Sequence, residues 1–228
     1  MGADKTRAGF AAIIGAPNAG KSTLVNALVG EKVSIVTQKV QTTRFPIRGV
    51  AMADSTQIVL VDTPGVFAPR RRLDRAMVRA AWTGARDADV VVHVVDAASR
   101  AAVEDGEGKA GQRRSVEDDD RVIDGLKESG KTAILALNKV DLMRRDRLLA
   151  MSQELFATGV YSDVFMVSAE KGYGVDDLKA TLASRMPDSP YFFPEDQSAD
   201  VPQRVMAAEI TREKVYLRLH KELPYASM

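Results

Sequence analysis

The 228-residue sequence contains no cysteine, which excludes a disulfide framework and a cysteine metal site and suits the cytoplasm. It has no apolar stretch approaching about 20 residues, so a membrane-spanning helix is excluded. Neither sign of charge dominates: 32 basic and 31 acidic residues give a net charge of +1, which creates no overall field that demands a nucleic-acid partner. Residues 1–7 lack the apolar core of a signal peptide, so secretion is not expected.

What the sequence does contain is a regular alternation of apolar runs and helical patterns. The runs that read as strands are 10–14, 58–62, 90–95, 132–137 and 164–167. The helical patterns are 21–28, 73–86, 120–128, 148–156 and 175–184. This alternation predicts an α/β fold with a mostly parallel central sheet flanked by helices, and segment 48–54 is expected to add an antiparallel edge strand beside 58–62. His93 alternates within its run and is expected in the core, and Trp82 is expected to pack a helix.

The length suits one core of about 180 residues with a short appendage. We expect a first domain over 1–186 and a linker over 187–201, where three prolines fall close together. From 202 to 219 the apolar residues partly fit one helical face, so we expect a helix there. The segment 101–120 is rich in glycine, alanine and charge and offers almost nothing to bury. We therefore expect a mobile surface loop, with a charged contact to a partner as the weaker alternative.

The most informative motif is GAPNAGKS, residues 15–22, which lies between an apolar run and a helical pattern. Its glycines let consecutive backbone N–H groups curl around phosphate oxygens. Lys21 would supply a point charge, Ser22 a hydroxyl ligand for Mg²⁺, and the helix start a positive dipole end. The residues expected to contact phosphates are Gly15, Pro17, Asn18, Ala19, Gly20, Lys21, Ser22 and Thr23.

A second motif, N-K-V-D, follows the apolar run 133–137 and so emerges at the carboxyl end of a strand. The carboxylate of Asp141 can accept two hydrogen bonds from guanine, a donor pair that adenine does not offer. The motif, Asn138 and Lys139 included, therefore favours GTP over ATP, although by itself it would fit a polar turn equally well. Ser168 and Ala169 follow a further apolar run, where a backbone N–H could contact the guanine O6.

Between these two motifs, the run 58–61 ends in D-T-P-G: Asp62, Thr63, Pro64 and Gly65. Asp62 would belong to the Mg²⁺ shell, and the Gly65 N–H would bond a γ-phosphate oxygen that is lost on hydrolysis. The same residue types also make an ordinary type II turn. The order of the motifs along the chain is what favours the nucleotide reading.

In chain order, G-x-x-x-x-G-K-S, a switch threonine, D-T-P-G, N-K-x-D and S-A resemble the translation-factor class of P-loop GTPases. Within its Era/TrmE-like branch, the chain is similar to the Era family of bacterial ribosome-assembly GTPases. Segment 36–47 (VTQKVQTTRFPI) resembles the first switch of that family, and 203–225 resembles the opening helix of its RNA-binding KH domain. The stretch 100–120 matches nothing expected in the family. The resemblance implies a P-loop GTPase domain followed by a helical stub, 202–228, of a KH domain that is incomplete because no G-x-x-G loop follows.

The resemblance also implies roles for single residues. Those with catalytic roles are Lys21, Thr43 and Gly65, and those that hold Mg²⁺ are Ser22, Thr43 and Asp62. The sequence does not decide between Thr42 and Thr43 as the switch threonine. Val66 and Phe67 stand where many small GTPases place a water-orienting glutamine, which implies slow turnover and help from a bound K⁺. Asn18 is the candidate ligand for that K⁺, and a loop-stabilising role for it is equally open.

The implied function is that of a GTPase switch in small (30S) subunit assembly and 16S rRNA maturation. Its implied partners are GTP and GDP, with 16S rRNA and the small ribosomal subunit in the complete protein. A monomer in the cytoplasm is expected, and peripheral contact with the inner membrane is left open. Two alternatives also remain open: a related GTPase of tRNA modification or large-subunit assembly, and a GTP-binding scaffold that does not hydrolyse. An ATP-dependent enzyme would require N-K-V-D to be accidental.

Overall fold

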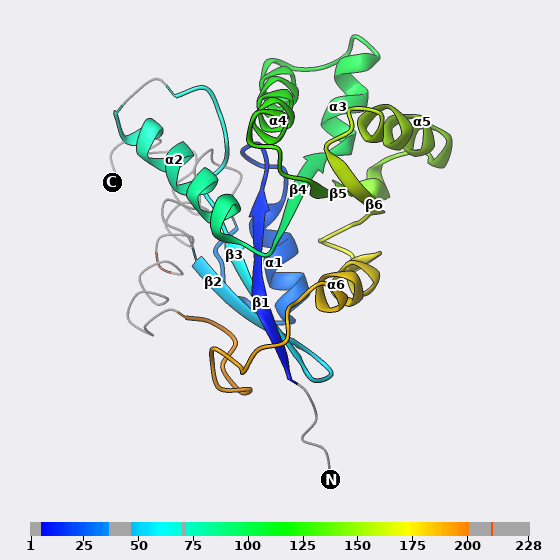
Figure 1. Ribbon diagram of the computed structural model, residues 1–228. Helices are drawn as coiled ribbons and strands as arrows, with labels where there is room; N and C mark the ends of the chain where they lie inside the picture. The colour runs from blue at the N-terminus through cyan, green and yellow to red at the C-terminus, as the bar shows by residue number, and fades with distance from the viewer. Residues whose placement is uncertain (1–5, 37–46, 70–71, 201–210, 212–228) are drawn as a thin grey trace.

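A computed structural model describes residues 6–36, 47–69, 72–200 and 211 of the chain. Its centre is a six-stranded sheet in the order β2-β3-β1-β4-β5-β6 (Figure 1). The strands are β1 (Arg7–Ile14), β2 (Ile47–Ala53), β3 (Thr56–Asp62), β4 (Val90–Asp96), β5 (Ala133–Asn138) and β6 (Tyr161–Met166). All neighbours pair in parallel except β2 and β3, which are antiparallel. The predicted sheet and its antiparallel edge strand are confirmed.

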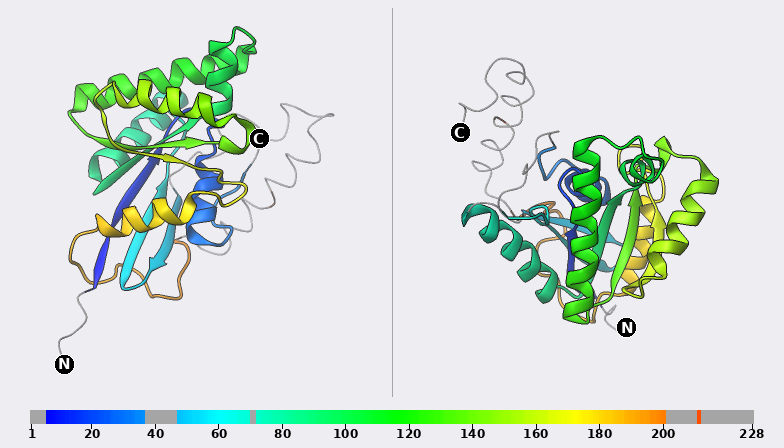
Figure 2. Two further views of the ribbon diagram at one scale, coloured as in Figure 1. Left: turned by 90° about the vertical axis from the view of Figure 1, so that its right-hand side faces the viewer. Right: turned by 90° about the horizontal axis from the view of Figure 1, so that it is seen from above.

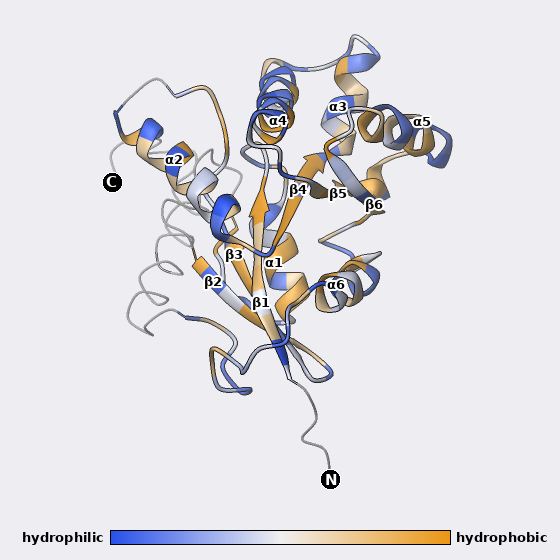
Figure 3. Ribbon diagram, in the orientation of Figure 1, coloured by the Kyte–Doolittle hydropathy of each residue, from blue (hydrophilic) through white to orange (hydrophobic). Residues whose placement is uncertain are grey.

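Helices cover both faces of the sheet (Figures 1 and 2). They are α1 (Lys21–Val29), α2 (Arg72–Asp87), α3 (Ala97–Glu104), α4 (Ala110–Ser129), α5 (Arg145–Phe156) and α6 (Val175–Ser184), with a short 3₁₀ turn, η1 (Val140–Leu142). One core cluster packs α1 and α6 against the sheet, and a second packs α2, α4 and α5 against the other face. The apolar strands and the polar outer sides of the helices are visible in Figure 3. Continuous apolar strands covered on both faces are what a mostly parallel sheet requires.

The expectation of a surface loop over 101–120 is wrong, because most of this segment is helical. It contains the end of α3 and the first half of α4. Asp96 caps α3, since its side chain accepts a hydrogen bond from the Ser99 N–H. The composition misled because the side chains that α4 buries here are Asp118 and Asp119, which count as solvent-facing in any hydropathy pattern.

The predicted linker packs along the base of the sheet. Pro187 O accepts a hydrogen bond from Ala8 N, and near its other end Ser198 O accepts one from Val50 N on β2. The predicted KH stub, the switch threonine and the alternative Thr42 lie outside the described residues, apart from residue 211, which is helical. Within the part of the chain that the structure describes, no helix is long and apolar enough to cross a bilayer.

Candidate nucleotide-binding site

The loop that carries GAPNAGKS joins β1 to α1, and its shape depends on positive φ angles that residues with a side chain rarely adopt. Gly15 has φ +148°, and a Cβ there would meet the Val94 carbonyl oxygen at 2.3 Å. Gly20 has φ +99°, and a Cβ there would meet the Asn138 side-chain nitrogen at 2.2 Å. Asn18 is also left-handed, at φ +64°. Both glycines are therefore needed for space as well as for φ.

Lys21 opens α1 and is 7% exposed. Its ammonium donates to Gly15 O at 3.2 Å and to Ala16 O at 2.8 Å, so it folds back over the loop. Burial lowers the pKa of Lys21 to about 8, while the charges of Asp62 and Asp119 act in the opposite direction. A buried cation of this kind is stabilised by an anion, and the loop beside it is the one predicted to bind phosphates through its backbone N–H groups.

Asp62 ends β3 and is fully buried. Its Oδ2 accepts hydrogen bonds from the Ser22 hydroxyl at 2.7 Å and from the Ser34 hydroxyl at 2.6 Å. The structure thus brings together the predicted metal ligands Ser22 and Asp62. Sequence reasoning missed Ser34, which belongs to no motif. A hydroxyl beside a carboxylate fits Mg²⁺, which prefers oxygen ligands and takes few of them from the protein.

The remainder of D-T-P-G passes close to the phosphate loop. A Cβ on Gly65 would meet Pro17 atoms at 2.9 to 3.1 Å, and Val66 N donates to Gly15 O at 3.0 Å. The Thr63 hydroxyl points elsewhere, because it donates to the Ile13 carbonyl at 2.7 Å inside the sheet. The two segments predicted to contact the phosphates are therefore joined by the hydrogen bond from Val66 to Gly15, with Gly65 close against Pro17.

Asn138, at the end of β5, connects the phosphate loop with the S-A segment. It is 2% exposed. Its amide nitrogen donates to Ala19 O at 2.9 Å, and its amide oxygen accepts from Ala169 N at 3.0 Å. The neighbouring Ser168 N donates to Tyr173 O at 2.9 Å. The amides of both S-A residues therefore have partners within the protein in this structure.

Lys139 extends across the site with φ +65°. Its ammonium donates to Asp96 Oδ2 at 2.6 Å and to Asn18 O at 3.1 Å. These residues and Pro17 line one cavity of about 730 Å³. Asp96 is a residue of this cavity that sequence reasoning missed, although the signal was there: like Asp62, it is a carboxylate that ends a buried strand.

Asp141 is exposed at the surface in η1. It lines a cavity of about 430 Å³ together with Ser168, Leu148 and Tyr173. Two of the predicted base-contacting residues, Asp141 and Ser168, thus share one recess that has an acidic side chain at its edge and apolar walls, whereas Lys139 lines the other cavity. Such walls suit a planar aromatic base, and the carboxylate suits its hydrogen-bond donors.

Comparison with known proteins agrees with this geometry. A family model described as "50S ribosome-binding GTPase" matches residues 10–139. GTPase Era of Maricaulis maris is 68% identical over 222 residues, which are 97% of this chain and 71% of that protein. GTPase Era of Caulobacter vibrioides is 65% identical over 223 residues, with 98% and 71% covered.

The chain belongs to the Era family of GTPases. A crystal structure of Era in complex with MgGDPNP and nucleotides 1506–1542 of 16S ribosomal RNA matches it with TM-score 0.82 and 33% identity, over 96% of this chain and 70% of that one. A variant of Aquifex aeolicus Era bound to GDP·AlF4⁻ matches with TM-score 0.81 and 33% identity, over the same shares of the two chains. The P-loop GTPase fold expected from the sequence is confirmed.

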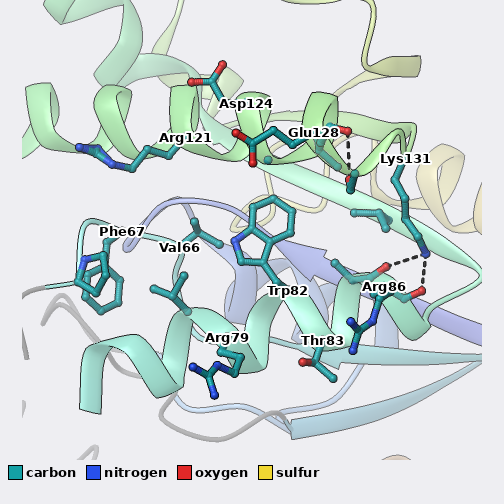
Figure 4. A pocket seen from close by; sticks show the side chains of 17 residues that line it. Val66, Phe67, Arg79, Trp82, Thr83, Arg86, Arg121, Asp124, Glu128 and Lys131 are labelled. Carbon is teal, nitrogen blue, oxygen red and sulfur yellow. Dashed lines mark hydrogen bonds between the residues drawn. The ribbon is translucent and has the colours of Figure 1, made fainter. Parts of the chain in front are cut away.

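In this Era-family chain, the residues after D-T-P-G border a second recess, between α2 and α4. Figure 4 shows Trp82 pointing from α2 toward α4, with Val66 and Phe67 at one end. Trp82 fits there because α4 has a glycine opposite it: a Cβ on Gly125 would meet the indole at 2.4 Å. The expectation that Trp82 packs a helix is confirmed. His93 is fully buried, as expected.

Proposed function

We propose that this chain binds GTP with Mg²⁺, hydrolyses it to GDP, and acts as a switch in assembly of the small (30S) ribosomal subunit and 16S rRNA maturation. The observation that carries the proposal is the convergence of four motifs at the carboxyl ends of the parallel strands of one sheet, the position where open α/β sheets bind ligands. The Era names of its relatives and the Era complex with MgGDPNP and 16S rRNA support the substrate and the RNA partner.

In this proposal, backbone amides of the phosphate loop and the ammonium of Lys21 bind the phosphates. Lys21 already lies over the loop, bonded to two of its carbonyl oxygens, and exchanges them for phosphate oxygens. Ser22 and Asp62 hold Mg²⁺, with Thr43 as the proposed switch ligand. The metal supplies neutralisation of charge on the β- and γ-phosphate oxygens.

Guanine recognition is assigned to Asp141, whose carboxylate would accept the N1–H and amino donors of the base. Asn138 does not need to touch the base to matter, since it fixes the loop that carries Ala169 relative to the phosphate loop. A competing base that lacks the two donors would leave the carboxylate unpaired on binding, which favours guanine over adenine.

Hydrolysis then requires a water in line with the bond between the γ-phosphorus and its bridging oxygen, which breaks as the water attacks. The Gly65 N–H is proposed to bond a γ-phosphate oxygen. No glutamine follows Gly65, where the sequence has Val66 and Phe67, so intrinsic turnover is expected to be slow. A K⁺ ion held by Asn18, which lines the cavity beside the phosphate loop, is the proposed aid.

The proposed domain division is 1–186 for the GTPase domain, 187–201 for the linker and 202–228 for the start of a KH domain. The segment 202–228 contains no glycine and therefore no G-x-x-G loop that could clamp RNA backbone. These 228 residues are thus expected to bind nucleotide but to lose sequence-selective binding to the 3′ end of 16S rRNA. Tight, selective gel-shift binding would contradict this. The monomeric state and membrane contact stay predictions.

The experiment that tests the nucleotide assignment is titration of the chain with fluorescent GDP, GTP and ATP analogues, with Asp141→Asn in parallel. We expect guanine-selective binding that shifts toward xanthine nucleotides in the variant, because the amide now offers a donor where the carboxylate accepted. Asp146→Asn is a matched control, since Asp146 is exposed at the start of α5 and lines neither cavity. Equal binding of ATP and GTP by the unmodified chain would refute the proposal.

A further inference from the structure

The phosphate loop is also held from beneath, by a residue of α4 that belongs to none of the nucleotide motifs. Asp119 is 1% exposed, and its Oδ1 accepts a hydrogen bond from the Ala16 N–H at 3.4 Å. Ala16 is the second residue of the loop, and its amide is directed at the buried carboxylate of Asp119 on α4. In Figure 1, α4 passes over the end of β1, where this loop begins.

Two further buried side chains line up behind Asp119. His93 on β4 places its Nε2 3.4 Å from Asp119 Oδ1, and its Nδ1 lies 2.8 Å from the Tyr161 hydroxyl of β6. If the tyrosine donates to Nδ1, the proton of the neutral imidazole is on Nε2 and faces the carboxylate. Both residues are at most 5% exposed. Two elements distant in sequence, the phosphate loop and β4, therefore converge on one carboxylate oxygen, and β6 supports the second of them through Tyr161.

The electrostatics agree with this arrangement. Burial raises the pKa of Asp119, and the nearby His93 imidazole, the Ala16 amide and the charge of Arg100 act in the opposite direction. The carboxylate in turn favours the charged form of Lys21, whose pKa burial lowers. Tyr161 is also buried, and its hydroxyl is close enough to be affected by the charge of Asp119. A carboxylate buried in this way destabilises the fold unless partners held in fixed positions compensate for its lost hydration.

We propose that Asp119, supported by His93 and Tyr161, is a positioning residue for the phosphate loop. Its carboxylate accepts the hydrogen bond of the Ala16 amide and thereby fixes the first residues of the loop, so that the following amides and Lys21 face the phosphates. The loop needs such support because several of its residues have positive φ, a conformation that the chain does not hold by local preference. This inference rests on the proposed nucleotide binding and extends it to a residue outside the motifs.

The test compares affinities for fluorescent GDP and a non-hydrolysable GTP analogue, measured well below the melting temperature of each variant. Asp119→Leu removes the acceptor, and both affinities are expected to fall about five- to thirtyfold, the usual effect of one lost buried hydrogen bond with an orphaned amide. Asp119→Asn keeps an oxygen acceptor for Ala16 and is expected to restore most of the affinity. The matched control is Asp120→Asn, because Asp120 is the next residue of α4 but is exposed and pairs with Arg100.

A purely structural role for Asp119 predicts a lower melting temperature with unchanged affinity in the folded molecules, and that result overturns the proposal. If Asp119→Leu does not fold, Tyr161→Phe decides, since it removes one hydroxyl and leaves the ring in place. We expect its GDP affinity to fall about threefold or more, and unchanged affinity overturns the proposal. Failure of the unmodified chain to bind guanine nucleotides would instead refute the proposed function.

Discussion

Replacing Asn138 by alanine is the sharpest test of how the site is assembled. The side chain is buried and makes two hydrogen bonds to backbone groups on different loops, Ala19 O and Ala169 N. Alanine leaves both groups without that partner. Each buried group left unpaired costs about 1 to 3 kcal/mol, so we expect the free energy of unfolding to fall by about 2 to 6 kcal/mol. This is a large part of the about 5 to 15 kcal/mol typical of a domain.

The same substitution should weaken nucleotide binding, because the phosphate loop and the S-A segment lose their common anchor. We expect the affinity for GDP to fall about tenfold or more, which corresponds to about 1.4 kcal/mol. Stability would be measured by urea unfolding and affinity by titration of fluorescent GDP. Both measurements are needed because the two effects have one structural cause.

Gln57→Ala is the matched control for Asn138→Ala. Gln57 is a buried amide too, and it makes three hydrogen bonds to backbone groups: it donates to Phe193 O at 2.8 Å and accepts from Phe192 N and Phe193 N at 2.9 and 3.0 Å. It lies at the start of β3, at the end of the sheet opposite the motifs. We expect a comparable loss of stability with GDP affinity unchanged. Equal losses of affinity in the two variants would refute the reasoning.

Two further predictions concern the loop and α4. Gly20→Ala is expected to reduce GDP affinity about tenfold or more, because the new Cβ meets the Asn138 amide at 2.2 Å and φ is +99°. The chain should stay folded, as measured by circular dichroism. Wild-type affinity for GDP would contradict this prediction. Asp118 accepts a hydrogen bond from Ala68 N, and burial raises its pKa from 3.8 to about 6. The folded state therefore binds the proton more tightly than the unfolded state, so this group makes stability fall as the pH rises from 3.8 to about 6. Asp118→Asn does not titrate, so its stability relative to wild type should rise over that interval in urea unfolding, and parallel pH profiles would exclude this role.

Much of the fold was predictable from local patterns in the sequence. Strands that are covered on both faces need continuous apolar runs. Those runs marked five of the six strands and showed that strands alternate with helices along the chain. The phosphate loop was predictable for a similar reason, since its glycines are needed where φ is positive and where neighbouring atoms leave no room for a Cβ. Such signals involve residues that are neighbours in the chain, so one sequence suffices to find them.

The roles of single polar residues were less accessible. A carboxylate at the end of a buried run marked Asp62, and the same signal was present at Asp96 but was not used. Ser34 had no signal of its own, because it meets Asp62 only through the folding of a loop between α1 and β2. A side chain that acts on a distant segment has no fixed spacing from that segment in the chain.

What the sequence by itself determined was the fold class and the chemistry of the motifs, because both depend on periodicity and on short spacings. Only the tertiary structure decided that Asn138 reaches Ala19, 119 positions away, and that Asp119 lies beneath the phosphate loop. The segment around Asp119 was expected to be a loop because acidic residues normally face water. Here α4 buries Asp119, since partners from β4 and the phosphate loop converge on it, and no pattern within the segment shows that convergence.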